Sequence, residues 1–263
     1  MNFNEKLENI VMKNNSMLCV GLDIDKDKIP AIFFEKSNNP YLDFNKTIID
    51  ATKDLVCAYK LNMAFYEVLG INGFKILSKT IEYIPKDIIV ILDGKRNDIG
   101  NTAKKYAKSL FETLNSDAVT INPYLGIDGV KPFLEYNDKC SFILCRTSNS
   151  SAGDFQDIKS NNIPLYQTVA SKIKSWNSSG NCGAVVGATY PDELKIIRGI
   201  LGENIPILIP GIGAQGGDVE KTVKYGTNKE GKMAIIVSSR SIIYAKNARV
   251  AANSLNDEIN KYK

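Results

Sequence analysis

Short apolar runs alternate along the chain with longer segments in which apolar residues recur every three to four positions. Short runs rich in β-branched residues indicate buried strands, whereas a recurrence of three to four is typical of amphipathic helices. Their alternation indicates βα units around a parallel sheet. The eight runs expected as strands are Leu18–Leu22, Ala58–Asn62, Ile88–Asp93, Ala118–Ile121, Phe142–Cys145, Gly183–Val186, Ile207–Ile209 and Ala234–Ser238.

The clearest of the intervening helices begins near Thr102, and its apolar residues predict one stripe that faces the sheet. That stripe consists of Ala103, Tyr106, Ala107, Leu110, Phe111 and Leu114. A short amphipathic helix over the N-terminal end of the sheet is expected from Phe3, Leu7, Ile10 and Val11. The last segment, Ala245–Lys263, predicts a closing helix.

Eight strand–helix units without a break in composition favour one domain over residues 1–263. The fold class that we predict is α/β, a single (β/α)8 TIM barrel with an N-terminal capping helix. A chain of 263 residues with 44% hydrophobic residues has enough material for such a core. A doubly wound open sheet has the same alternation and is the alternative.

The absence of histidine narrows the available chemistry more than any other feature of the composition. It excludes Ser-His-Asp and Cys-His mechanisms and any histidine-ligated metal site. Proton transfer must then use lysine, carboxylate, tyrosine or cysteine side chains. The net charge of +4 comes from interspersed charges, so no basic stripe for nucleic acid and no patch for a membrane surface is expected.

Five cysteines without a Cys-x-x-Cys pair indicate free thiols in a reducing compartment. No apolar core typical of a signal peptide precedes the first expected strand. The apolar runs are also too short to cross a bilayer. We therefore expect a cytoplasmic protein without membrane association.

The most informative charged residues lie in the segment 92–102, directly after an apolar run. Asp93 and Lys95 are two positions apart at a strand end, so both side chains project to the same side of the sheet. Lys60, near the end of the preceding strand, adds a second ammonium. An isolated Asp-x-Lys is usually a surface ion pair, but the apolar run and the matching lysine favour a confined site at the C-terminal rim of a barrel.

A glycine-rich loop, Pro210–Asp218, follows the seventh expected strand. Glycines let backbone N–H groups approach an anion, and barrels often bind phosphate with the loops after strands seven and eight. Arg240 at the end of the eighth strand adds a cation suited to phosphate. The loop also fits Gly-x-Gly-x-x-Gly, but in Rossmann folds that motif occupies the first βα turn. We therefore predict a phosphate site.

These motifs, in this order, resemble those of the orotidine 5′-monophosphate decarboxylase family. They are Leu22-Asp23, Tyr59-Lys60, Asp93-x-Lys95-x-x-Asp98-Ile99-x-x-Thr102, Pro210-Gly-x-Gly-Ala-Gln215-Gly-Gly-Asp218 and Ser239-Arg240-Ser241. The segment 122–126, Asn-Pro-Tyr-Leu-Gly, is similar to the longer bacterial and protozoan branch. The resemblance spans most of the chain and implies a cofactor-free and metal-free decarboxylation of orotidine 5′-monophosphate to UMP, the final step of de novo UMP biosynthesis.

The catalytic residues implied by the resemblance are Lys95, Asp93, Lys60 and Asp98. Lys95 is expected to protonate C6 of the pyrimidine as carbon dioxide leaves, with Asp93 against the substrate carboxylate. Asp98, with Ile99 and Thr102 beside it, is expected to reach the site of a second subunit, which implies a homodimer.

The resemblance places Asp23 at a ribose hydroxyl, and Gln215 and Arg240 at the phosphate. It places Ser148 at the pyrimidine edge, with Thr147 as the alternative. Ser239 stands where many members have glycine. The full set of expected substrate-binding residues is Asp23, Asn62, Ile99, Thr102, Ser148, Pro210, Gln215, Gly217, Ser239 and Arg240.

Three alternatives remain at this point. A magnesium-dependent sugar-phosphate decarboxylase or aldolase on the same barrel generally needs additional carboxylates at the strand ends, where this chain has Lys60. A Schiff base on Lys95 is another enzymatic possibility. A non-catalytic nucleotide-binding protein is the alternative from a different class, but binding alone does not require the full set of charges.

Overall fold

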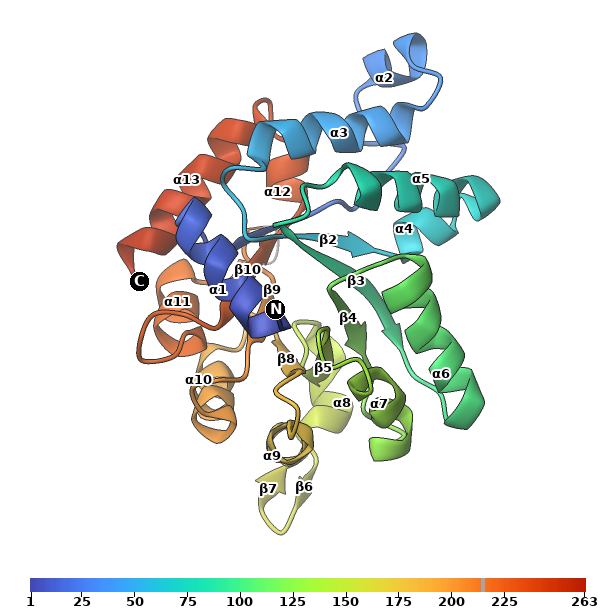
Figure 1. The fold of residues 1–263 in the computed structure, drawn as a ribbon. Helices are drawn as coiled ribbons and strands as arrows, with labels where there is room; N and C mark the ends of the chain where they lie inside the picture. The colour runs from blue at the N-terminus through green and yellow to red at the C-terminus, as the bar shows by residue number, and fades with distance from the viewer. Residues whose placement is uncertain (214–215) are drawn as a thin grey trace.

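The computed structural model describes residues 1–213 and 216–263. Eight parallel strands close into a barrel in the order β1-β10-β9-β8-β5-β4-β3-β2, with helices around it (Figure 1). The predicted barrel is confirmed, and the doubly wound alternative is wrong. The barrel strands are β1 (Leu18–Gly21), β2 (Ala58–Asn62), β3 (Ile89–Arg96), β4 (Ala118–Ile121), β5 (Cys140–Arg146), β8 (Cys182–Val186), β9 (Ile207–Pro210) and β10 (Ala234–Ser238).

Closure of the barrel depends on pairing between the first and last strands. β1 pairs in parallel with β10, Leu18 lying opposite Ile236, and β1 also pairs with β2 on its other side. Strands β1, β4, β8 and β10 are buried at every position. Burial on both faces explains why these strands read in the sequence as continuous apolar runs rather than as alternating patterns.

The outer layer consists of helices that connect successive strands, together with two helices after the last strand (Figure 1). They are α2 (Ala31–Lys36), α3 (Pro40–Thr52), α4 (Ala64–Glu67), α5 (Gly70–Tyr83), α6 (Gly100–Lys108), α7 (Ile127–Leu134), α8 (Gly153–Gln156), α9 (Leu165–Trp176), α10 (Pro191–Leu201), α11 (Val219–Gly226), α12 (Arg240–Ile243) and α13 (Ala248–Lys261). The closing helix was therefore predicted correctly, although it begins three residues later than expected.

One residue of the predicted apolar stripe faces outward. Ala103 and Ala107 of α6 are buried, and the π-helical turn Ser109–Thr113 that follows buries two more residues of the stripe. Tyr106 at the edge of the stripe is 38% exposed. The guanidinium of Arg96 lies 5.7 Å from the centroid of its ring, so the ring covers a cation instead of the core.

Helix α1 (Phe3–Asn14) crosses the front of the barrel in Figure 1. All four apolar residues predicted for its inner face are buried. Phe3 packs edge-on against Phe142 of β5, with ring centroids 5.8 Å apart. Lys6 donates a hydrogen bond to the Asp117 carboxylate at 2.7 Å. The predicted capping helix is therefore present.

An insertion between β5 and α9, residues 147–164, was not predicted. It contains a 3-10 turn (Ser150–Ala152), helix α8 and a small antiparallel hairpin of β6 (Lys159–Ser160) and β7 (Ile163–Pro164). Asn161 and Asn162, which form the hairpin turn, both have positive φ. Two-residue hairpin turns favour asparagine for that reason, so the Asn-Asn pair was a usable signal.

All five cysteine side chains are buried and free, so the free thiols expected from the sequence are confirmed. Within residues 1–213 and 216–263, no helix has the length and apolar character needed to cross a membrane.

Candidate active site

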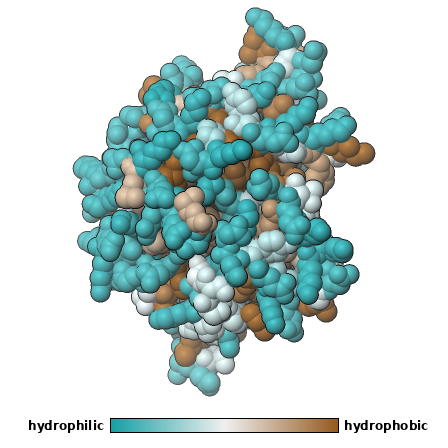
Figure 2. Space-filling view, in the orientation of Figure 1, coloured by the Kyte–Doolittle hydropathy of each residue, from teal (hydrophilic) through white to brown (hydrophobic). Residues whose placement is uncertain are grey.

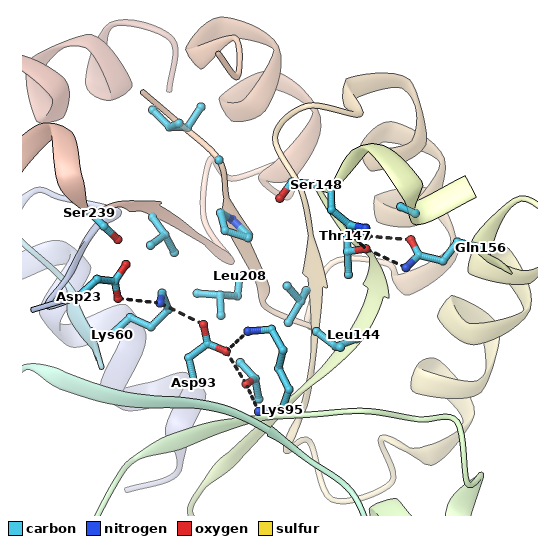
Figure 3. Close-up of a pocket in the computed structure, with 18 of the residues that line it drawn as sticks. Asp23, Lys60, Asp93, Lys95, Leu144, Thr147, Ser148, Gln156, Leu208 and Ser239 are labelled. Carbon is cyan, nitrogen blue, oxygen red and sulfur yellow. Dashed lines mark hydrogen bonds and ion pairs between the residues drawn. The ribbon is translucent and has the colours of Figure 1, made fainter. Parts of the chain in front are cut away.

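A cavity of about 630 Å³ opens at the C-terminal ends of the barrel strands (Figure 3). Active sites of (β/α)8 barrels lie at this end. The structure brings eight of the expected site residues together there, from β2, β3 and the segment after β1 on one side and from the end of β9 and the segments after β5 and β10 on the other. These eight are Asp23, Lys60, Asp93, Lys95, Ser148, Pro210, Ser239 and Arg240.

Asp93 forms the centre of a charge network inside the cavity. One carboxylate oxygen lies 2.7 Å from the Lys95 ammonium, and the other lies 3.0 Å from the Lys60 ammonium. Lys60 also lies 3.7 Å from the Asp23 carboxylate. Because β2 and β3 pair in register, Asn62 opposite Asp93, the lysine two residues earlier on β2 reaches the same carboxylate.

Burial and charge act in opposite directions on Asp93 and Lys60. Burial by itself favours the neutral forms, but the two ammonium groups and the hydrogen bonds to Asp93 outweigh it and hold the pKa of this carboxyl far below its ordinary value. Burial likewise opposes the charge on Lys60, yet Asp93 and Asp23 raise its pKa above the usual lysine range. Asp93 and Lys60 are therefore both ionised at neutral pH.

Thr120 of β4 links Asp93 and Lys95, a role that was not predicted from the sequence. Its hydroxyl donates to the Asp93 carboxylate at 2.8 Å and accepts from the Lys95 backbone N–H at 3.0 Å. The backbone of Lys95 has a φ of +48°, and the pairing of β3 with β4 shifts register between Leu92 and Arg96. A positive φ is uncommon for lysine, so the hydrogen bond that the Lys95 N–H donates to Thr120 stabilises a strained conformation.

Two tyrosines fix the backbone around Asp23 from outside the cavity. The Tyr66 hydroxyl donates to the carbonyl of Leu22 at 3.0 Å. The Tyr244 hydroxyl donates to the carbonyl of Asp23 at 2.9 Å and accepts from the backbone N–H of Asp25 at 2.8 Å. Asp23 is therefore held in place through its main chain, which leaves its carboxylate facing Lys60.

The glycine-rich loop and Arg240 lie side by side at one end of the cavity. Pro210, Gly211 and Ile212 line it together with Ser239 and Arg240. Gly211 and Gly213 have φ values of +111° and +87°, which favour glycine. Ala214 and Gln215 lie outside the described residues, so the expected phosphate contact of Gln215 remains a prediction.

Ser239 takes the place of the glycine noted above for this position, and Gly21 makes room for its side chain. A Cβ at position 21 would collide with the Ser239 side chain. Gly21 of β1 therefore leaves the room that the larger residue needs. Gly217 is also sterically required, since a Cβ there would lie 2.6 Å from the Ala188 side chain. Gly217 is not among the residues that line the cavity.

Four further expected site residues do not line the cavity of this chain. The Asn62 side-chain oxygen instead accepts from the N–H of Ala64 at the start of α4, at 3.2 Å. Asp98 is half-buried outside the cavity, while Ile99 is 58% exposed and Thr102 is exposed. Within one chain, the charge network thus has Asp23 where the prediction had Asp98.

Over residues 1–213 and 216–263, no group of three or more acidic or cysteine side chains lies close enough together to hold a metal ion.

Comparisons with known proteins give a consistent result. The family model described as "Orotidine 5'-phosphate decarboxylase / HUMPS family" matches residues 16–255. The orotidine 5′-phosphate decarboxylase of Dehalococcoides mccartyi is 47% identical, with 100% of this chain and 99% of the relative covered. That of Cellvibrio japonicus is 48% identical, with 99% of this chain and 98% of the relative covered.

Solved structures agree with the sequence relatives. The structure of Leishmania donovani OMP decarboxylase is similar with a TM-score of 0.90 and 36% identity, covering 100% of this chain and 98% of that one. The structure of Leishmania donovani UMP synthase is similar with a TM-score of 0.92 and 38% identity, covering 100% of this chain and 56% of that one.

Proposed function

The chain belongs to the orotidine 5′-phosphate decarboxylase / HUMPS family, and on this premise we propose that it converts orotidine 5′-monophosphate to UMP and carbon dioxide. The observation that carries the proposal is the Asp93 carboxylate held between the Lys60 and Lys95 ammonium groups in the cavity. Relatives that are 44% to 48% identical along nearly the whole chain bear the decarboxylase name, which favours this reaction over sugar-phosphate chemistry.

Lys95 is the proposed acid. When the bond between C6 and the carboxylate breaks, the electron pair stays on C6 as a poorly delocalised carbanion in the ring plane. A fixed ammonium stabilises this charge electrostatically, then transfers a proton to C6 and becomes a neutral amine. The Lys95 side chain is 48% exposed, so the amine can regain a proton from solvent.

Asp93 is placed against the substrate carboxylate in this mechanism. It lies between the two lysines and stays ionised, so it holds both ammonium groups on the side of the cavity where negative charge develops. Lys60 is 5% exposed, far less than Lys95, and both of its carboxylate neighbours hold it as an ammonium. We assign it to charge balance rather than to proton transfer.

Binding of the remote groups supplies the energy that positions the base. Arg240, with Gln215, is assigned to the phosphate, Asp23 to a ribose hydroxyl and Ser148 to the pyrimidine edge. Pro210 and Ser239 line the same end of the cavity as Arg240.

A homodimer is part of the proposal. Besides Ile99, large apolar side chains are exposed just after α4, on α5 and on the loop before α7: Val68 at 79%, Ile71 at 78% and Tyr124 at 81%. Figure 2 shows apolar surface at the outer end of α5, on the side of the barrel that carries α6 in Figure 1. Monomers rarely expose such patches. A second copy would cover them and bring Asp98, Ile99 and Thr102 to the partner's cavity.

A cytoplasmic location is proposed as well, because five free cysteine side chains suit a reducing compartment.

The test is ultraviolet-monitored turnover of orotidine 5′-monophosphate by purified protein in excess chelator. Metal-independent formation of UMP is the expected result. A folded protein without turnover would contradict the proposal and would make magnesium-dependent sugar-phosphate chemistry the next reaction to assay. Sedimentation of the same sample measures whether the active species is a dimer.

A further inference from the structure

Gln156 of α8 lies in the wall of the cavity opposite the charge network (Figure 3). We propose that Gln156 is a positioning residue that fixes Ser148 and thereby sets the preference of the cavity for a uracil-type over a cytosine-type base edge. The inference rests on the proposed function and deepens it, because it names the residue that makes the pyrimidine contact selective.

The amide of Gln156 is engaged on both sides by Thr147. Its oxygen accepts from the Thr147 backbone N–H at 2.9 Å, and its nitrogen donates to the Thr147 hydroxyl at 2.8 Å. The Thr147 hydroxyl in turn donates to the side-chain oxygen of Asn149 at 2.7 Å. A hydroxyl has one proton to donate, so the proton of Thr147 is already used within the loop.

Ser148 has the opposite character. Across the described residues its hydroxyl makes no hydrogen bond, and in Figure 3 it points into the cavity while Thr147 turns toward Gln156. These contacts favour Ser148 over Thr147 as the hydroxyl that meets the base, the choice that the sequence left open.

The backbone of Ser148 is also restrained from the side of β8. A Cβ at position 187 would lie 2.7 Å from the Ser148 Cβ and 2.8 Å from its Cα, so only glycine fits there. The Thr189 hydroxyl donates to the Ser148 carbonyl at 3.4 Å. Gln156 on one side and the segment 187–189 on the other therefore hold residues 147 and 148 between them.

A buried charge anchors α8 next to Gln156. The Arg146 guanidinium at the end of β5 is 3% exposed and donates to the Asp157 carboxylate at 3.1 Å. It also lies 4.0 Å from the centroid of the Tyr190 ring. Because Asp157 directly follows Gln156, this anchor fixes Gln156 relative to the barrel before any substrate binds.

Recognition of the base edge depends on this fixed geometry. Uracil presents an N–H donor at N3 between two carbonyls, whereas cytosine presents an unprotonated N3 beside an amino group. A hydroxyl can donate or accept, so on a backbone that is free to move it would satisfy either edge. A site built for one hydrogen-bonding pattern rejects the other strongly only when its polar groups are held in place.

The experiment compares dissociation constants for UMP and CMP by calorimetry. Wild type is expected to prefer UMP. Gln156→Leu removes both hydrogen bonds at similar volume, and we expect UMP binding to weaken about tenfold while the preference for UMP over CMP falls by a similar factor. Gln167→Leu, the same change on α9 outside the cavity, is the matched control and should leave both constants unchanged.

Two further variants separate positioning from a general structural effect. The double variant Gln156→Leu, Thr147→Val should be close to Gln156→Leu alone, because the hydroxyl contact with Gln156 that Thr147→Val removes is one of the two that Gln156→Leu already removes. Gln156→Glu keeps the acceptor and loses the donor, so its preference should lie between wild type and Gln156→Leu. It also covers the case in which the leucine variant fails to fold.

An unchanged UMP to CMP ratio in a folded Gln156→Leu or Gln156→Glu protein would overturn the positioning role, as would equal weakening of both nucleotides. If wild type turned over orotidine 5′-monophosphate in such a case, the proposed function would stand and only this inference would fall. A wild-type protein that shows neither turnover nor a preference for UMP would overturn both.

Discussion

The two walls of the cavity are built from different parts of the fold. On one wall, Lys60, Asp93 and Lys95 belong to strands β2 and β3, and Asp23 lies two residues after β1. Their backbones are held in the barrel by strand pairing. On the other wall, Ser148 and Arg240 belong to the insertion after β5 and to the start of α12, beyond the ends of the strands.

This difference separates two tasks. Charges that stabilise a transition state act best when they need no rearrangement during the reaction, and rigid strands provide that. Contacts to the base and the phosphate must form when substrate enters and break when product leaves, which suits loops. The charged wall is expected to determine the rate of the chemical step, and the loop wall to determine affinity and selectivity.

Replacing Lys95 should break the charged wall most completely. We expect Lys95→Ala to lower kcat by at least about 10³-fold, because both the proton donor and the charge that stabilises the carbanion are lost. Single-turnover kinetics followed in the ultraviolet measures this effect. Lys105→Ala on the exposed face of α6 is the control and should retain full activity. Substantial activity in a folded Lys95→Ala protein would contradict the assignment of Lys95 as the proton donor.

Replacing Asp93 should affect stability as well as activity. Asp93→Asn leaves the buried Lys60 with Asp23 at 3.7 Å as its remaining carboxylate, and breaking a buried ion pair costs about 3 to 5 kcal/mol. Urea unfolding at pH 7 tests this. Asp54→Asn, which disrupts an exposed pair with Arg249, should cost at most about 1 kcal/mol.

The Asp93 effect should also depend on pH. The pKa of this carboxyl lies lower in the folded chain than its value of about 3.9 in an unfolded chain. Its stabilisation is therefore complete well above pH 4 and is lost as the pH falls further. The difference between wild type and Asp93→Asn should shrink between pH 7 and pH 3. Equal stability of wild type and Asp93→Asn at pH 7 would instead mean that the cost of desolvating these buried charges cancels the attraction between them.

Replacing Arg240 by alanine tests whether the loop wall determines affinity for the phosphate. Loss of a charged contact to phosphate should cost about 1.5 to 3 kcal/mol, or roughly tenfold to 100-fold in kcat/KM for orotidine 5′-monophosphate. The nucleoside orotidine, which lacks the phosphate, should react equally slowly with Arg240→Ala and wild type. Arg249→Ala, an exposed arginine on α13, serves as the control. An unchanged kcat/KM for the nucleotide would remove the phosphate role.

The smallest of these effects concerns the link between the two reacting charges. Thr120→Val removes one donor to Asp93 and one acceptor for Lys95, and we expect kcat to fall about tenfold with little change in KM. Thr120→Ser keeps the hydroxyl and should restore most of the rate. A change in KM alone, or no rescue by serine, would assign Thr120 to packing rather than to positioning.

Much of the charged wall could be predicted from the sequence because its residues follow buried strands. Such strands appear as continuous apolar runs, so Asp93 and Lys60 could be assigned to strand ends directly. Strand β3 was expected to end at Asp93, but it continues to Arg96. The reason is the register shift beside Lys95, which depends on pairing with β4.

The residues that were missed act through contacts that only the folded chain creates. Thr120 resembles any β-branched strand residue, and its role depends on which residue of β3 lies beside it. Gln156 contacts Thr147 across nine positions through an insertion whose path the sequence did not reveal. Asn62 does not line the cavity for a local reason, since its side-chain oxygen accepts a hydrogen bond from the N–H of Ala64 at the start of α4.

Barrel closure has a consequence for how the protein is made. The charged wall is encoded within the first hundred residues, but β1 pairs with β10, and Arg240 lies two residues after β10. A ribosome releases the chain from its N-terminus at about 5 to 20 residues per second. A nascent chain therefore carries its catalytic charges for many seconds before the final strand emerges. Until then β1 lacks one neighbour, so a growing chain can be neither closed nor active.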